Sequence, residues 1–160
     1  MIGGEDGDAA VSLYEHDFYA WANEQAALLR SGRLAAADIE HIAEEIESMG
    51  KTEKRELVSR LTVLLTHQLN WRHQPDRIGA SWRATIRIQR RDLAAHLEDN
   101  PSLKAVLPEA VARAFGNAVI EAGAETGLSE ATFPPVCPWS FERMMDETFW
   151  PEPAKDDPTP

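Results

Sequence analysis

The sequence has little of what secreted and membrane proteins need. Its 160 residues include a single cysteine, Cys137, so no disulfide can form within the chain. No apolar run approaches the roughly 18 residues that a membrane-spanning helix requires. The first ten residues, MIGGEDGDAA, hold neither a basic region nor an apolar stretch and do not form a secretory signal. We therefore expect a cytoplasmic protein with no membrane partner.

The motifs of several enzyme classes are also missing. The chain has no Gly-rich phosphate loop, no Gly-x-Ser-x-Gly, no His-Glu-x-x-His and no Cys-x-x-Cys. Nucleotide hydrolysis, serine hydrolysis and zinc chemistry of these types therefore lack support. We predict no cofactor, and we favour an interaction role over an enzymatic one.

Apolar residues recur at helical spacing along most of the chain, and no strand-like alternation is long enough to build a sheet. The composition, 43% hydrophobic and 27% charged, is that of an ordinary globular protein. We predict an all-α fold, a single-domain bundle of about five helices. The domain is expected over residues 13–151, between a frayed N-terminus at 1–12 and a flexible tail at 152–160.

The helices are expected at residues 14–30, 39–49, 51–71, 81–97 and 108–126. Asp38 is the predicted N-cap of the second helix, and Gly50 is predicted to kink or break the chain before the third. Gly127 is the expected C-terminal stop of the last helix.

Apolar stripes identify the inward faces of these helices. The first helix is expected to bury Phe18, Trp21, Ala22 and Leu29. The second carries one stripe of Ile39, Ile42, Ile46 and Met49, with Glu40, Glu44 and Glu47 on the outer face. The segment from Phe133 to Trp150, rich in proline and aromatic residues, is predicted to wrap the bundle.

The stretch from Tyr14 to Pro151 resembles a bacterial family catalogued as domain of unknown function twenty-nine. The matching pieces are YEHDFYAW, AEEIESMGKTEKRELVSRLTVLLTHQLNW, SWRATIRIQRRDL, NPSL, AETGL and FPPVCPW. The resemblance implies an all-helical fold. It implies no activity, because none is assigned to that family.

Basic residues are concentrated in one quarter of the chain. Residues 51–91 hold ten lysines and arginines against three acidic residues, whereas the remainder holds six basic and 24 acidic residues, and the whole chain has a net charge of -11. On a helical wheel Arg83, Arg87, Arg90 and Arg91 fall together, an arrangement suited to phosphate groups. The predicted binding surface comprises Arg72, Arg83, Arg87, Arg90, Arg91, Trp71 and Trp82.

Two partners fit this surface, a nucleic acid whose bases stack on the tryptophans or an acidic protein surface. Self-association is a further option. The alternative is that these arginines pair with the acidic residues of 40–47 or simply face solvent.

A rival, enzymatic interpretation rests on Arg60 and His67. Their Arg-x6-His spacing places both on one helix face and is similar to the motif of the HEPN superfamily, which includes metal-independent ribonucleases acting as dimers. The resemblance implies that Arg60 positions a phosphate and His67 assists proton transfer, with Glu56 orienting the arginine. Leu61 departs from the polar residue that usually follows the arginine. The structural alternative is that Glu56 pairs with Arg60 and His67 hydrogen-bonds across the bundle.

We predict no metal site. The weak candidates are His41 and Glu45, one helical turn apart, which with His67 could supply three ligands if the helices brought them together. No histidine has a glutamate three residues before it, as a ferritin-like di-iron site requires.

Overall fold

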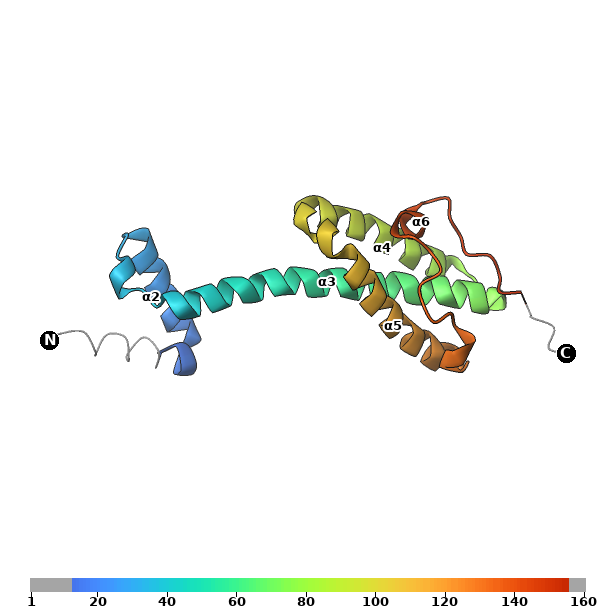
Figure 1. Ribbon diagram of the computed structural model, residues 1–160, viewed down its shortest axis with the longest axis horizontal. Helices are drawn as coiled ribbons and strands as arrows, with labels where there is room; N and C mark the ends of the chain where they lie inside the picture. Colours follow the sequence, from blue (N-terminus) through green and yellow to red (C-terminus); the bar gives the residue numbers. More distant parts are fainter. Residues whose placement is uncertain (1–12, 156–160) are drawn as a thin grey trace. The chain divides into compact units, whose positions relative to one another are not determined.

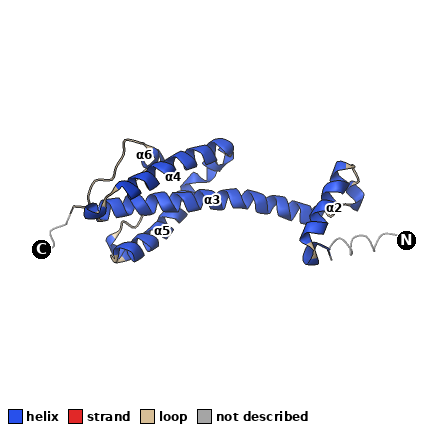
Figure 2. Cartoon of the chain, turned by 180° about the vertical axis from the view of Figure 1, so that it is seen from behind, coloured by secondary structure: helices blue, strands red, loops and turns tan. Residues whose placement is uncertain are grey.

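The structure, a computed structural model, describes residues 13–155, and this range contains helices and no strand (Figures 1 and 2). The all-α prediction is confirmed. None of the described helices is long and apolar enough to cross a membrane. The chain divides into two compact units, Met1–Thr52 and Glu53–Pro160. The single domain over residues 13–151 therefore stays a prediction.

The first unit contains α2 (Phe18–Arg30), a short 3₁₀ helix (Leu34–Ala36) and the beginning of α3 (Ile39–His73). The first helix was expected to start at residue 14, and residues 13–16 are helical, but α2 itself begins at Phe18. Asp17 leaves helical geometry between them and accepts a hydrogen bond from the Ala20 amide at 3.0 Å. The expected burial of Trp21 is confirmed, with 3% exposed. Phe18 and Leu29, expected inside, are 49% and 42% exposed.

Helix α3 continues from Ile39 to His73 without interruption, so the break expected at Gly50 is wrong. A glycine inside a helix costs only about 1 kcal/mol relative to alanine, and good helix formers flank this one on both sides. The predicted cap is present, because Asp38 Oδ1 accepts from the His41 amide at 3.4 Å.

The apolar stripe on the first part of α3 is largely uncovered. Ile39, Ile46 and Met49 are 53%, 63% and 68% exposed, and Ile42 is half-buried. We call Ile39, Ile46 and Met49 the exposed stripe. Within the first unit, the apolar pattern therefore correctly indicated a helix but not a buried face.

The second unit is a bundle in which α3, α4 (Ala80–Asp99) and α5 (Leu107–Thr126) lie side by side (Figure 1). The turn between α3 and α4 is the 3₁₀ helix Pro75–Arg77, and Pro101–Val106 links α4 to α5. Gly127 ends α5 in the left-handed conformation, with φ at 73°, as predicted. The five fully buried leucines of α3 form the centre of the core, at positions Leu57, Leu61, Leu64, Leu65 and Leu69.

The segment after α5 packs on this core, which agrees with the predicted aromatic wrap. Phe133 and Trp139 are buried, and the short helix α6 (Phe141–Met145) buries Met144 completely. The Gln68 side chain donates to the Met144 carbonyl at 3.1 Å. Trp150 packs on Trp71 with ring centroids 4.6 Å apart.

Candidate functional site

One face of α4 presents three exposed arginines. Arg83, Arg87 and Arg91 follow one another at intervals of four residues and therefore share a face. Among residues 13–155, no ion pair joins any of the three to a carboxylate.

Arg90 is different, because its side chain is part of the core. It is 3% exposed, its Nε donates to the Met144 carbonyl at 2.8 Å, and its Nη2 donates to the Phe149 carbonyl at 2.6 Å. Its guanidinium also lies 5.3 Å from the Trp150 ring centroid. Burial lowers the pKa of Arg90, an effect that nearby Asp146 opposes. Arg90 therefore anchors the C-terminal segment rather than facing a partner.

The tryptophans predicted to stack on bases are engaged within the protein. Trp71 is 6% exposed, and the Arg83 guanidinium lies 5.1 Å from its ring centroid and 5.7 Å from that of Trp150. Trp82 is half-buried and packs against the core. Arg72 is also half-buried. These rings strengthen the fold but present little free face to a ligand.

Arg87, Arg90 and Arg91, but not Arg83, border a groove of about 650 Å³, which we call the arginine groove. Its walls combine basic and apolar side chains with one glutamate. The lining residues are Ala84, Arg87, Ile88, Arg90, Arg91, Ala94, Met145, Glu147 and Trp150. A ligand in this groove would meet cations and apolar surface together.

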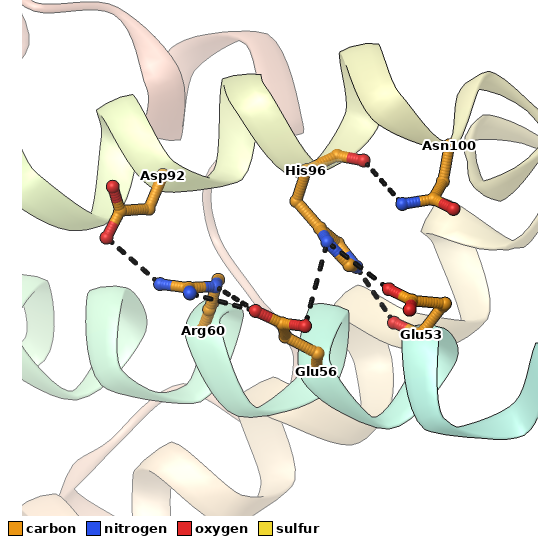
Figure 3. Close-up of polar contacts among 6 residues, drawn as sticks. All are labelled: Glu53, Glu56, Arg60, Asp92, His96 and Asn100. Carbon is orange, nitrogen blue, oxygen red and sulfur yellow. Dashed lines mark hydrogen bonds and ion pairs between the residues drawn. The ribbon is translucent and has the colours of Figure 1, made fainter. Parts of the chain in front are cut away.

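Arg60 is held between two helices by carboxylates (Figure 3). Its Nε and Nη2 donate to Glu56 Oε1 at 3.0 and 2.8 Å, and its Nη1 donates to Asp92 Oδ2 on α4 at 3.0 Å. The pairing of Glu56 with Arg60 is the one that the structural alternative expected. The guanidinium is therefore occupied on both sides.

His67 does not join Arg60. The His67 Nδ1 atom lies 2.8 Å from the Val63 carbonyl oxygen of its own helix, and no hydrogen bond between Arg60 and His67 occurs in the described residues. Two residues seven positions apart on a helix share a face but are separated by about 10 Å along the helix axis. His67 also does not hydrogen-bond across the bundle through Nδ1. The HEPN-like ribonuclease is not supported.

A cluster that the sequence analysis missed lies beside Arg60. His96 on α4 places Nδ1 3.7 Å from Glu53 Oε2 and 3.9 Å from Glu56 Oε2 on α3 (Figure 3). Its other ring nitrogen, Nε2, lies 2.9 Å from the Glu53 carbonyl oxygen. Potential ligand atoms of Glu53, Glu56 and His96 all lie within 4.8 Å of one another. We call these three residues the carboxylate–imidazole cluster.

The sequence did contain a signal for this cluster. In two antiparallel helices joined by a turn, residues equally far from the turn face each other. Glu56 and His96 are equally far from Asp76 in the turn, and so are Arg60 and Asp92. Ligand motifs whose members all lie on one helix do not reveal such pairs across a turn.

The family described as Domain of unknown function DUF29 matches residues 13–150. The chain belongs to the DUF29 family. No significant match to a curated protein or to a solved structure was found. Membership confirms the resemblance seen in the sequence and assigns no activity, so any function of this DUF29 chain must be argued from its own residues.

The two weak metal candidates take part in a polar network of the first unit of this DUF29 chain. His41 Nδ1 lies 2.7 Å from Asp38 Oδ2, and the His41 ring stacks on Tyr14 with centroids 3.9 Å apart. The hydrogen bond to Asp38 raises the pKa of His41. Glu45 accepts from the Tyr14 hydroxyl at 2.6 Å, which contributes most to raising the pKa of Tyr14 to about 12. Neither candidate belongs to the one metal-capable group found among the described residues.

Proposed function

We propose that this DUF29 domain is a protein-interaction module whose arginine groove binds an acidic amphipathic helix. The observation that carries the proposal is the groove itself, where exposed Arg87 and Arg91 lie beside Ile88 and Met145. An amphipathic helix laid in a groove needs both kinds of contact, apolar anchors and complementary charge at the rim.

The properties of this surface favour a protein segment over a nucleic acid. Base stacking needs free aromatic faces, and Trp71 is buried against Trp150 and Arg83. Outside residues 51–91 the chain carries six basic and 24 acidic residues, which repel a polyanion at long range. An acidic helix is shorter and less charged than a nucleic acid, and it uses the apolar half of the groove.

The occupant that we propose is the segment 39–49 of a second copy of this chain. Its exposed stripe places Ile39, Ile46 and Met49 on one face, and contiguous exposed apolar surface on a soluble helix marks an interaction site. The same segment carries exposed Glu40, Glu44 and Glu47 and no lysine or arginine. Charge and apolar character are therefore complementary to the arginine groove.

The lengths of the two charged rows also agree. With a rise of 1.5 Å per residue, Arg87 to Arg91 spans about 6 Å along α4, and Glu40 to Glu44 also spans about 6 Å. The two exposed arginines of the groove can therefore face two glutamates at once. Reciprocal docking of two copies gives a closed two-fold dimer, which satisfies both surfaces without forming a filament.

Charge reversal in the groove tests this proposal. We expect the double variant Arg87→Glu/Arg91→Glu to weaken self-association by about tenfold or more, because each attraction of up to about 1 kcal/mol is replaced by repulsion. Sedimentation velocity across a concentration and salt series measures the dissociation constant. Arg113→Glu, an exposed arginine on α5, is the matched control and should leave it unchanged.

A charge swap makes the test specific for the occupant. Mixing the groove variant with a Glu40→Arg/Glu44→Arg variant should restore a mixed dimer, because both of its contacts are attractive. One contact pairs the reversed groove with the reversed segment, and the other pairs the two unaltered surfaces. A chain that is monomeric at every concentration, or that associates equally well after charge reversal, would contradict the proposal. The proposal would also be contradicted if the protein were monomeric and its groove bound labelled single-stranded RNA with a steep salt dependence, since the partner would then be a nucleic acid.

A further inference from the structure

We propose that the carboxylate–imidazole cluster, Glu53, Glu56 and His96, binds one divalent transition-metal ion such as Zn²⁺. This inference does not depend on the proposed function, because the cluster includes no residue of the arginine groove. It rests on the orientation of His96, on the spacing of the three ligand atoms and on the residues that hold them (Figure 3).

The orientation of His96 is the orientation of a metal ligand. A carbonyl oxygen can only accept, so Nε2 carries the hydrogen that it donates to the Glu53 carbonyl at 2.9 Å. With one ring hydrogen, on Nε2, the lone pair is on Nδ1, which points at the two carboxylates. The distances of 3.7 and 3.9 Å are too long for hydrogen bonds. Metal-bound histidines commonly donate their second ring nitrogen to a backbone carbonyl in this way.

The burial of His96 makes its free nitrogen significant. The side chain is 8% exposed, whereas Glu53 and Glu56 are 45% and 40% exposed. The imidazole is thus fixed, and the carboxylates leave a path for an ion from solvent. Its Nδ1 has no hydrogen-bond partner among the described residues.

The spacing suits a tetrahedral ion. Metal–nitrogen and metal–oxygen bonds of about 2.1 Å place neighbouring tetrahedral ligands about 3.4 Å apart. The separations of 3.7 and 3.9 Å from His96 Nδ1 exceed this by a few tenths of an ångström, and the two carboxylate ligand atoms lie within 4.8 Å of each other. Small rotations of Glu53 and Glu56 would close the site, and an open fourth position would take water.

Arg60 positions one ligand without being one itself. It binds Oε1 of Glu56 and leaves Oε2 directed at His96, while Asp92 holds the other side of the guanidinium. The carboxylates of Glu53, Glu56 and Asp92 carry three negative charges, and the Arg60 guanidinium carries one positive charge. The net charge of -2 around the site balances a divalent ion. One imidazole and two carboxylates favour Zn²⁺ or Co²⁺ over Mg²⁺.

The test is a Zn²⁺ titration of the full chain, after chelator treatment, in competition with a chromophoric chelator. We expect one Zn²⁺ per chain and no comparable binding of Mg²⁺. Glu53→Gln and His96→Gln should each weaken Zn²⁺ binding at least tenfold, with circular dichroism checking the fold. Glu98→Gln, an exposed glutamate on α4, and His41→Gln are matched controls that should not change it.

Co²⁺ absorption adds a readout of geometry. Intense visible bands in the unaltered chain that disappear in Glu53→Gln would place the ion in the cluster. Arg60→Gln should weaken Zn²⁺ binding by about tenfold, as expected for a residue that orients a ligand. Stoichiometric binding that is unchanged in Glu53→Gln and His96→Gln, or no Zn²⁺ binding tighter than millimolar, would overturn the proposal.

Discussion

Arg90 illustrates how one charged side chain can organise a segment that has no long helix of its own. Its two hydrogen bonds reach the Met144 and Phe149 carbonyls, at the two ends of the turn after α6. A buried carbonyl that loses its partner costs about 1–3 kcal/mol. The C-terminal wrap therefore depends on an arginine that the sequence analysis assigned to the binding surface.

We accordingly predict that Arg90→Met destabilises the protein by about 1–3 kcal/mol, because the volume is retained but the Phe149 carbonyl loses its donor and the Met144 carbonyl keeps only the donor from Gln68. Urea unfolding followed by tryptophan fluorescence measures the change. Arg91→Met, on the exposed neighbour, should change the free energy of unfolding by less than about 0.5 kcal/mol. Equal effects of the two substitutions would show that the carbonyl contacts contribute nothing.

For single residues, contacts within one helix could be predicted from the sequence, whereas contacts between elements could not. The Glu56–Arg60 pair was predictable, because residues four apart on a helix are neighbours whatever the tertiary structure. The contact of His96 with Glu53 and Glu56 depends on how α4 lies against α3. The burial of Arg90 beside exposed Arg87 and Arg91 depends on where residues 144–149 pack. Neither is determined by local spacing.

At the scale of elements, periodicity located the helices well and their interruptions poorly. The pattern predicted the helix near Trp21 and the helix ending at Gly127, and both are present. It placed a kink or a break at Gly50, and α3 has no break there. The two glycines differ in backbone conformation, since Gly127 has a φ of 73° whereas Gly50 has no positive φ. Composition alone cannot separate a glycine that ends a helix from one inside it.

Because of this difference, we predict that replacing each glycine by alanine changes the stability in opposite directions. Gly50→Ala should stabilise α3 by up to about 1 kcal/mol, because the added Cβ meets nothing within 4 Å and the helix gains an alanine. Gly127→Ala should destabilise by about 1 kcal/mol, because its φ disfavours a side chain. Hydrogen exchange of the amides around each position, together with urea unfolding, measures both. Destabilisation by Gly50→Ala would indicate that a close neighbour occupies that face in solution.

For the whole molecule, the unequal distribution of buried apolar residues is the main fact. Within residues 13–155, every member of the hydrophobic core cluster lies between Leu57 and Trp150. Trp21 is the one buried apolar side chain described in the first unit. Because burial of apolar surface is the dominant stabilising contribution, the second unit should hold nearly all of the stability.

A fragment of residues 51–160 should therefore fold alone and unfold cooperatively, with a free energy of unfolding within about 1 kcal/mol of the full chain's main transition. It retains the arginine groove and the carboxylate–imidazole cluster but lacks the exposed stripe. We expect it to be monomeric, to bind Zn²⁺ as the full chain does, and to bind a synthetic peptide of residues 38–50 in a salt-sensitive manner. Calorimetry, sedimentation and fluorescence anisotropy measure these three properties separately.

A fragment that fails to fold would show that Met1–Thr52 stabilises the bundle. A folded fragment that still dimerises would show that the exposed stripe is not the occupant of the groove, because the contact would then form without it.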